Sequence, residues 1–80
     1  MDRDAVRLKI QELLRDILDD DEIVLTDDMT ASDVVDWDST NHVRLIVALE
    51  EDLGIRFETE EITAPESVGQ LVELLASKLG

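Results

Sequence analysis

The feature that most constrains the fold of this chain is the spacing of its apolar residues, which recur three and four positions apart in three separate segments. This spacing places the apolar side chains of each segment along one face of a helix. It predicts helices over about residues 3–18, 39–53 and 68–79. The predicted apolar faces are formed by Val6, Ile10, Leu13, Leu14, Ile17 and Leu18, by Val43, Ile46, Val47, Leu49 and Leu53, and by Val68, Leu71, Val72, Leu75 and Leu79.

Capping residues support the ends of these helices. Asp38 and Ser39 are both suitable N-caps for the second helix, and Gly54 is expected to stop it. Ser67 and Gln70 have the spacing of a capping box at the start of the last helix. The helix boundaries are therefore set by local sequence as well as by the apolar pattern.

A fourth, short helix is expected at Thr59 to Ile62, because a threonine cap is followed there by the acidic pair Glu60 and Glu61. The β-branched runs elsewhere in the chain are too short to form a sheet. The sequence thus predicts an all-α four-helix bundle with three long helices and one short helix. We expect a single domain that covers residues 1–80.

The segment between the first two long helices, about residues 18–38, has no helical period, and its acidic clusters alternate with short apolar groups. A connection of this length is uncommon in a compact domain unless it is functional. We expect the segment to be ordered by apolar side chains that pack on the bundle, with the single tryptophan buried. These side chains are Ile23, Val24, Leu25, Met29, Val34, Val35 and Trp37.

The charge of the chain restricts its partners. Twenty-one acidic and seven basic residues give a formal net charge of −14, which repels nucleic acid and favours proteins with basic surfaces. The chain has no cysteine and no apolar run long enough to span a bilayer, which requires about 20 residues. We therefore expect an acidic, cytoplasmic monomer that neither binds nucleic acid nor inserts stably into a membrane.

Ser39 is the residue whose position is best suited to chemistry. It ends the long loop and begins the second helix, where backbone N–H groups and the helix dipole favour an anion. A phosphodiester on its hydroxyl would be stabilised at that point. On local sequence alone, however, a simple helix cap at Asp38 or Ser39 explains the same residues.

The sequence WDSTNHVRLIVALEEDLGIRF around Ser39 resembles the core signature of acyl carrier proteins. In that family an Asp-Ser-Leu signature opens the second helix, which ends in an Ala-Leu-Glu-Glu stretch. The resemblance extends over the first helix, the acidic loop, the short helix and the last helix, hence over nearly the whole chain. The matching signature residues are Asp38, Ser39, Ala48, Leu49, Glu50 and Glu51.

This resemblance implies an acyl-carrier-like fold in which Ser39, preceded by Asp38, accepts 4'-phosphopantetheine from coenzyme A through a phosphopantetheinyl transferase. It implies a non-catalytic carrier that presents a thioester-linked acyl group to acyl-loading and acyl-using enzymes in lipid, polyketide or related biosynthesis. Family members also shelter cargo between their helices. Candidates for lining such a space, all of which also suit a packed core, are Val47, Leu49, Ile62, Leu71 and Leu75.

The second helix also departs from the family pattern. Thr40 replaces the usual leucine, and Asn41 and Arg44 make its solvent side less acidic than in general fatty-acid carriers. Because single charges can set partner choice, these changes favour a specialised carrier. We expect docking on basic partner patches to involve Asp38, Thr40, Asn41, Val43, Arg44, Val47, Glu50 and Glu51.

Other functions are compatible with some of these features. One alternative is an acidic helical adaptor without a prosthetic group, and another is an aminoacyl or peptidyl carrier. A hydrolase using Ser39 and His42 would need an orienting carboxylate and an oxyanion hole, of which the sequence gives no sign, so we expect His42 to be an exposed helix residue. The acidic clusters at residues 19–21 and 27–28 lack EF-hand spacing, and no metal site is expected.

Overall fold

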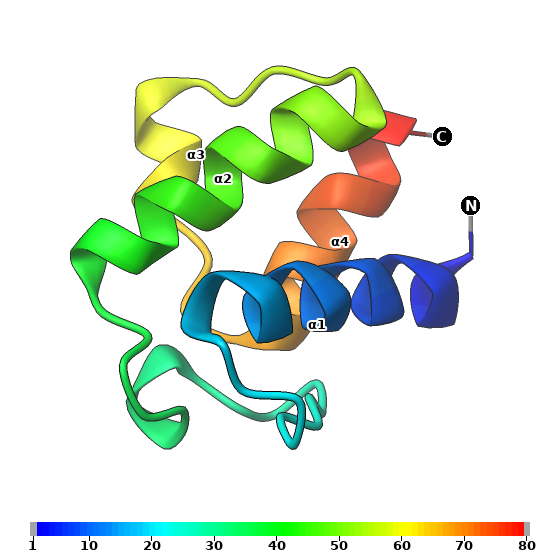
Figure 1. The fold of residues 1–80 in the computed structure, drawn as a ribbon. Helices are drawn as coiled ribbons and strands as arrows, with labels where there is room; N and C mark the ends of the chain where they lie inside the picture. Colours follow the sequence, from blue (N-terminus) through cyan, green and yellow to red (C-terminus); the bar gives the residue numbers. More distant parts are fainter. Residues whose placement is uncertain (1, 80) are drawn as a thin grey trace.

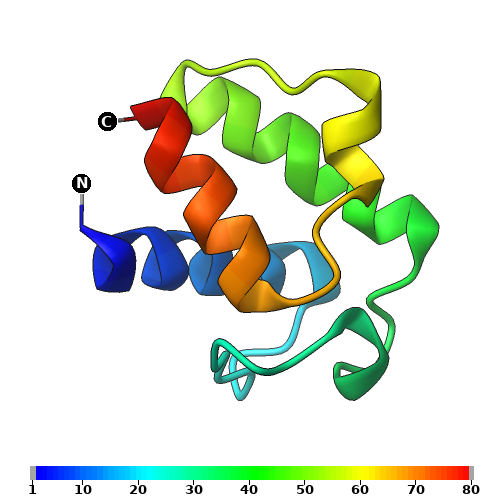
Figure 2. The same ribbon diagram turned by 180° about the vertical axis from the view of Figure 1, so that it is seen from behind.

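The computed structural model describes residues 2–79. Within this range α1 packs against both α2 and α4, and the short α3 lies beside α2 (Figures 1 and 2). No β-strand occurs among the described residues, so the predicted all-α bundle of three long helices and one short helix is confirmed. The elements are α1 (Arg3–Leu18), the 3-10 helix η1 (Ala31–Asp33), α2 (Ser39–Leu53), α3 (Thr59–Thr63) and α4 (Val68–Leu79).

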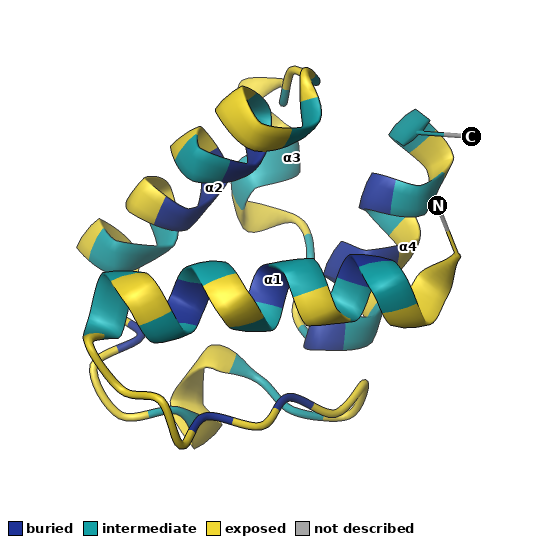
Figure 3. Ribbon diagram, turned by 45° about the vertical axis from the view of Figure 1, so that its right-hand side comes forward, coloured by how far each residue is buried: buried dark blue, intermediate teal, exposed yellow. Residues whose placement is uncertain are grey.

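The core lies where the inward faces of α1, α2 and α4 meet, and Figure 3 colours the buried residues of these helices dark blue. The structure corrects the apolar face predicted for α2. Leu45 is fully buried, whereas Val43 and Val47 are 50% and 45% exposed. Because successive helical residues are about 100° apart, Leu45 lies on the same side as Ile46 and Leu49, and the two valines lie outside it. Their exposure leaves an apolar surface on α2.

The long loop between α1 and α2 is ordered by the core, as predicted. The prediction is wrong for Val24 and Val35, which are 64% and 82% exposed. The alternation from Ile23 to Leu25 is that of extended chain, in which successive side chains point in opposite directions. The loop residues that are buried in the core or packed against it are Ile23, Leu25, Trp37, Met29 and Val34.

The beginning of α4 fixes the middle of this loop. The amides of Val68 and Gly69 donate to the carbonyl oxygens of Met29 and Asp27, each at 2.8 Å. A Cβ atom at position 69 would lie 3.0 Å from the Asp27 carbonyl oxygen, so glycine permits this close approach. Two free amides of the helix N-terminus are thereby satisfied by loop carbonyls.

The loop also contains η1, which the apolar pattern did not predict. Its cap residue Thr30 and its last residue Asp33 form a capping box, in which the Thr30 amide donates to the Asp33 carboxylate at 2.9 Å. η1 brings the loop back towards α2.

The capping box predicted for α4 forms only in part. Ser67 Oγ accepts from the Gln70 amide at 3.2 Å, but the Gln70 side chain accepts from the amide of Glu66.

An ion pair attaches α3 to α4. Lys78 Nζ lies 2.7 Å from Glu61 Oε1, and both side chains are largely buried. The Lys78 ammonium and, secondarily, the Glu58 amide lower the pKa of Glu61 below its ordinary value. Since the pKa of Glu61 is lower in the folded state, its ionised carboxylate stabilises the fold. This stabilisation is present above the unfolded pKa of about 4.3 and is lost as the pH falls through the folded pKa.

Replacing Glu61 with glutamine is therefore expected to lower the melting temperature by a few degrees at neutral pH. The difference from the unchanged protein should shrink when the pH falls below about 4, because the carboxylate of the unchanged protein is then protonated. Thermal melts followed by circular dichroism from acid to neutral pH would measure this. Glu60→Gln, at an exposed position of α3, is the control. A deficit in Glu61→Gln that is equal at all pH values would contradict the assignment.

Candidate functional site

Ser39 is the first residue of α2 and is exposed. The cap of the helix is supplied by Asp38, whose side chain accepts from the Asn41 amide at 2.9 Å. The Asp38 carbonyl oxygen accepts from the His42 amide at 2.8 Å. Of the two cap residues that the sequence offered, the structure therefore uses Asp38. The Ser39 hydroxyl is not required for the cap and is available for chemistry.

A tight turn presents Ser39 at the end of the loop. Asp36 has a positive φ of 69°, and its carbonyl oxygen accepts from the Asp38 amide at 2.9 Å. The same oxygen accepts from the side-chain amide of Asn41 at 2.8 Å, which ties the turn to the first turn of α2. The position of Ser39 is thus fixed from both sides by local hydrogen bonds.

A groove of about 480 Å³ opens next to Ser39. It lies between η1, the beginning of α2 and the end of α3, and its size falls within the usual range for small-molecule sites. Its walls are mainly apolar, with hydroxyl groups among them. The groove is lined by Ala31, Ser32, Trp37, Asp38, Ser39, His42, Val43, Ile62, Thr63 and Pro65.

A chain of two hydrogen bonds crosses this region. Trp37 Nε1 donates to His42 Nδ1 at 3.1 Å, and His42 Nε2 lies 2.7 Å from the carbonyl oxygen of Ile62. An indole N–H can only donate, so Nδ1 accepts and the ring proton on Nε2 is donated to Ile62. The chain joins the loop, α2 and α3 through one side chain.

The prediction that His42 is an exposed helix residue is therefore wrong. The side chain is half-buried because it satisfies both the indole of Trp37 and a carbonyl of α3. Trp37 itself is buried at 7% exposure, as predicted, and it also lines the groove beside Ser39. With both ring nitrogens of His42 engaged, neither is free to accept a proton from Ser39. The geometry does not fit a serine hydrolase.

The residues predicted to dock partners lie along α2. Thr40, Val43, Arg44, Val47 and Glu51 are exposed, and they extend from Ser39 towards the other end of the helix. Two members of the predicted set are partly buried and already engaged. These are Asn41, bonded to the turn at Asp36, and Glu50, whose carboxylate accepts from the Phe57 amide at 2.9 Å.

The surroundings of Ser39 suit the phosphopantetheine group that the resemblance implies. The amides of Asn41 and His42 are used by Asp38, which leaves those of Ser39 and Thr40 without an intrahelical partner at the positive end of the helix dipole. A phosphodiester on Ser39 is therefore favoured electrostatically. The adjoining groove, which Trp37 also lines, would have room for the organic part of the group.

The described part of the chain has no candidate metal site and no candidate membrane span. Among residues 2–79, no group of three or more histidine, cysteine or acidic side chains has the arrangement needed to hold a metal ion. In the same range, no helix is both long and apolar enough to cross a membrane.

Comparisons with known proteins identify the family. Residues 8–75 match the family described as "Phosphopantetheine attachment site". Polyketide-8 synthase acyl carrier protein 2 of Streptomyces avermitilis is 38% identical over 72 residues, which cover 90% of this chain and 83% of that protein. The acyl carrier protein of Petrotoga mobilis is 35% identical over 79 residues, covering 99% and 93% of the two chains.

A solved structure supports the same conclusion. The solution structure of holo acyl carrier protein from Geobacter metallireducens superposes with a TM-score of 0.84 at 38% identity, and the match covers 92% of this chain and 85% of that one. Such agreement in sequence and fold leaves the adaptor without a prosthetic group unsupported. The chain belongs to the acyl carrier protein family, whose members are non-catalytic carriers with 4'-phosphopantetheine as their prosthetic group.

Proposed function

We propose that Ser39 is the attachment residue and that residues 1–80 form a single carrier domain that holds an acyl group through it. The observation that carries this proposal is the exposed Ser39 hydroxyl at the N-terminus of α2, with the cap supplied by Asp38 and a groove beside it. When bound, phosphopantetheine supplies a terminal thiol on a flexible arm, which holds acyl groups as thioesters. The contribution of the protein is to position and present them.

The attachment step uses Ser39 as the nucleophile. Its Oγ atom forms a bond to the phosphorus of coenzyme A that carries the pantetheine, while the pyrophosphate P–O bond breaks and adenosine 3',5'-bisphosphate leaves. The hydroxyl proton passes to a base of the phosphopantetheinyl transferase. No acid or base of this chain is needed, which agrees with the engagement of both ring nitrogens of His42.

The proposal is tested by the intact mass of the purified protein after incubation with coenzyme A, magnesium and a broad-specificity phosphopantetheinyl transferase. We expect every molecule to gain the mass of one phosphopantetheinyl group. If the folded protein is unmodified at the start and its mass does not change, the carrier function is wrong.

We further propose that the exposed side of α2 is the docking surface for the transferase and for acyl-loading and acyl-using enzymes. Val43 and Val47 form an apolar strip along it, with Thr40, Arg44 and Glu51 exposed on the same helix. An apolar strip flanked by charges suits a transient contact, with the charges guiding the encounter with a basic patch. Asp38, Asn41 and Glu50 also belong to this surface, and their side chains already form hydrogen bonds within the protein.

Reversing the charge of Glu51 is expected to weaken binding to the transferase roughly tenfold. The variant Glu51→Lys removes one attraction to a basic patch and adds one repulsion, each worth up to about 1 kcal/mol. Binding titrations at low and moderate salt would measure the loss, which should be smaller at the higher salt. Glu73→Lys makes the same change on an exposed residue of α4 and is the control. Equal weakening by both variants would contradict a surface on α2.

We infer a specialised carrier of polyketide, lipid or related biosynthesis that acts in the cytoplasm. Similarity to a polyketide synthase carrier and the exposed Arg44 on α2 support this proposal. Aminoacyl or peptidyl cargo is the alternative. Mass spectrometry of the protein isolated from its own cells would distinguish the two. An acyl and an aminoacyl group differ in mass, and only the aminoacyl group has an amine that amine-modifying reagents can label.

A further inference from the structure

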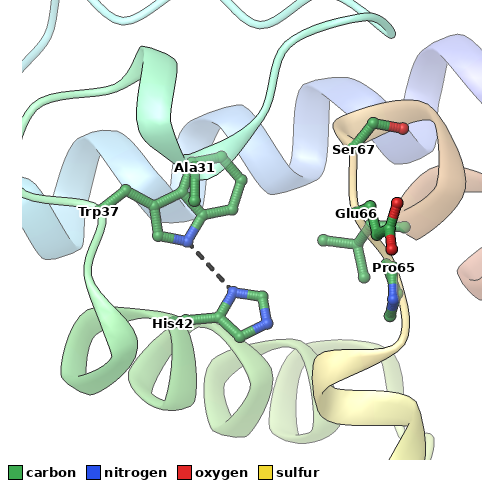
Figure 4. Close-up of a pocket in the computed structure, with 7 residues that line it drawn as sticks. Ala31, Trp37, His42, Pro65, Glu66 and Ser67 are labelled. Atoms are coloured by element: carbon green, nitrogen blue, oxygen red, sulfur yellow. Dashed lines mark hydrogen bonds between the residues drawn. The ribbon is translucent and has the colours of Figure 1, made fainter.

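Two hollows lie next to each other beside α2, and they share four lining residues. The first is the groove of about 480 Å³ next to Ser39, and the second is a small cavity of about 60 Å³. Figure 4 shows the cavity with the hydrogen-bonded Trp37 and His42 on one side and Pro65, Glu66 and Ser67 on the other. The cavity also reaches the buried core residue Leu71. The residues common to both hollows are Ala31, Trp37, His42 and Pro65.

We propose that the Trp37–His42 pair is a partition between the groove and the core, and that it confines a group tethered to Ser39 to the groove. This inference rests on the proposed attachment at Ser39. It makes Trp37 and His42 specificity-determining residues for the cargo.

The partition is held in place by its own hydrogen bonds. His42 is fixed between the Trp37 indole and the Ile62 carbonyl, at 3.1 Å and 2.7 Å, and therefore bridges the two walls of the groove. Moving either ring aside would leave a partly buried polar group without a partner, which is costly. The passage from Ser39 towards the core is thus closed by a bonded pair rather than by a loosely packed side chain.

The space behind the partition is too small for an extended chain. A cavity of about 60 Å³ has room for only a few water molecules. Beyond it the core is filled by side chains that are at most 2% exposed, among them Leu49, Leu71 and Leu75. A long alkyl chain could enter only by displacing close-packed side chains. These three leucines therefore act as core residues in this protein.

The groove itself defines the class of cargo. Its walls include the apolar side chains of Val43, Ile62 and Pro65, and the hydroxyl groups of Ser32 and Thr63 lie among them. Such a surface suits a short acyl group, with or without oxygen substituents, that remains at the surface. Cargo held there stays accessible to partner enzymes docked on α2. We therefore infer short acyl groups as the substrate class.

The first part of the test uses the unmodified protein and does not depend on Ser39. Trp37 is the single tryptophan, so quenching of its fluorescence by acrylamide reports on the partition alone. We expect quenching to increase several-fold in His42→Ala. His42→Gln should keep it low, because the amide can accept from the indole and donate to Ile62 as the imidazole does. Thr40→Ala, at an exposed position, is the control and should match the unchanged protein.

The second part loads the protein with acetyl, hexanoyl and decanoyl coenzyme A by means of the transferase and records methyl NMR spectra. In the unchanged protein, all three groups should shift the methyl signals of Val43 and Ile62 and leave those of Leu49 and Leu75 in place. In His42→Ala, decanoyl should shift the core leucine signals, whereas acetyl should not. The spectra report position and do not depend on turnover.

The outcomes separate this inference from the proposed function. Decanoyl-dependent shifts of Leu49 and Leu75 in the unchanged protein would overturn the partition, as would equal quenching of Trp37 in all variants. Failure of the protein to gain mass on incubation with the acyl coenzymes would instead overturn attachment at Ser39, and the quenching result would still decide whether Trp37 and His42 close the core.

Discussion

Replacing Ser39 with alanine is expected to abolish phosphopantetheine loading completely and to leave the fold unchanged. The loss is complete because the Oγ atom that forms the new bond is absent. The fold is kept because Asp38, and not Ser39, caps α2, and because Ser39 is exposed. A surface change of this kind alters stability by no more than about 0.5 kcal/mol. Intact mass after incubation with the transferase and a circular dichroism melt would measure the two effects.

A matched variant makes this result specific. Ser77→Ala makes the same substitution at an exposed serine of α4, away from the proposed docking surface. This variant should gain one phosphopantetheinyl group as the unchanged protein does. Loading of Ser39→Ala, or loss of loading in Ser77→Ala alone, would place the attachment on a different residue.

Truncation of the core is expected to have the largest effect on stability. Leu14 on α1 is fully buried, and removing its side chain to give Leu14→Ala should cost about 2–5 kcal/mol, from lost burial and from the cavity left behind. For a domain of this size that corresponds to a fall in melting temperature of roughly 10 to 30 °C. A chain of 80 residues has little stability in reserve, so part of the population could unfold at physiological temperature.

The same substitution on the same helix provides the control. Leu8 is 51% exposed on α1, so Leu8→Ala should change stability by no more than about 0.5 kcal/mol. Comparable losses in both variants would mean that α1 does not pack on the bundle through the face containing Leu14. Denaturant titration of the two proteins side by side would measure the difference.

The positions of the long helices could be predicted from the sequence because several local signals agree at each end. The apolar period, the cap at Asp38 and the stop at Gly54, which has a φ of 67°, all specify the same limits for α2. The sequence does not decide which residues of α2 face the core. Val43, Val47 and Leu45 are all apolar, and only the packing of α2 on α1 and the common core selects among them.

The loop illustrates the limit of sequence patterns more clearly. Hydrophobicity alone indicated that Val24 and Val35 would pack. Val24 instead points outward between the buried residues Ile23 and Leu25 of an extended segment, and Val35 lies in the turn that follows η1. The 3-10 helix η1 was missed because three residues are too few for a periodic signal. Its Thr30 and Asp33 capping pair was the available clue.

At the site, Ser39 and Asp38 could be found from the sequence because they are adjacent and carry a recognisable pattern. The role of His42 could not be predicted from the sequence. Its partners are Trp37 at the end of the loop and the backbone of Ile62, 20 residues further along the chain. A carbonyl oxygen carries no signature in the sequence. Only the packing of α3 beside α2 reveals that this histidine is a bridge.

Fragment mass spectrometry of the loaded protein, in which backbone cleavage locates the modified residue, tests attachment at Ser39 directly. Other hydroxyl groups lie near Ser39, those of Ser32 and Thr63 in the groove and that of Thr40 next along the chain, so the location is informative. We expect one phosphopantetheinyl group on Ser39 and none elsewhere. A group found on any other residue, with Ser39 unmodified, would contradict it.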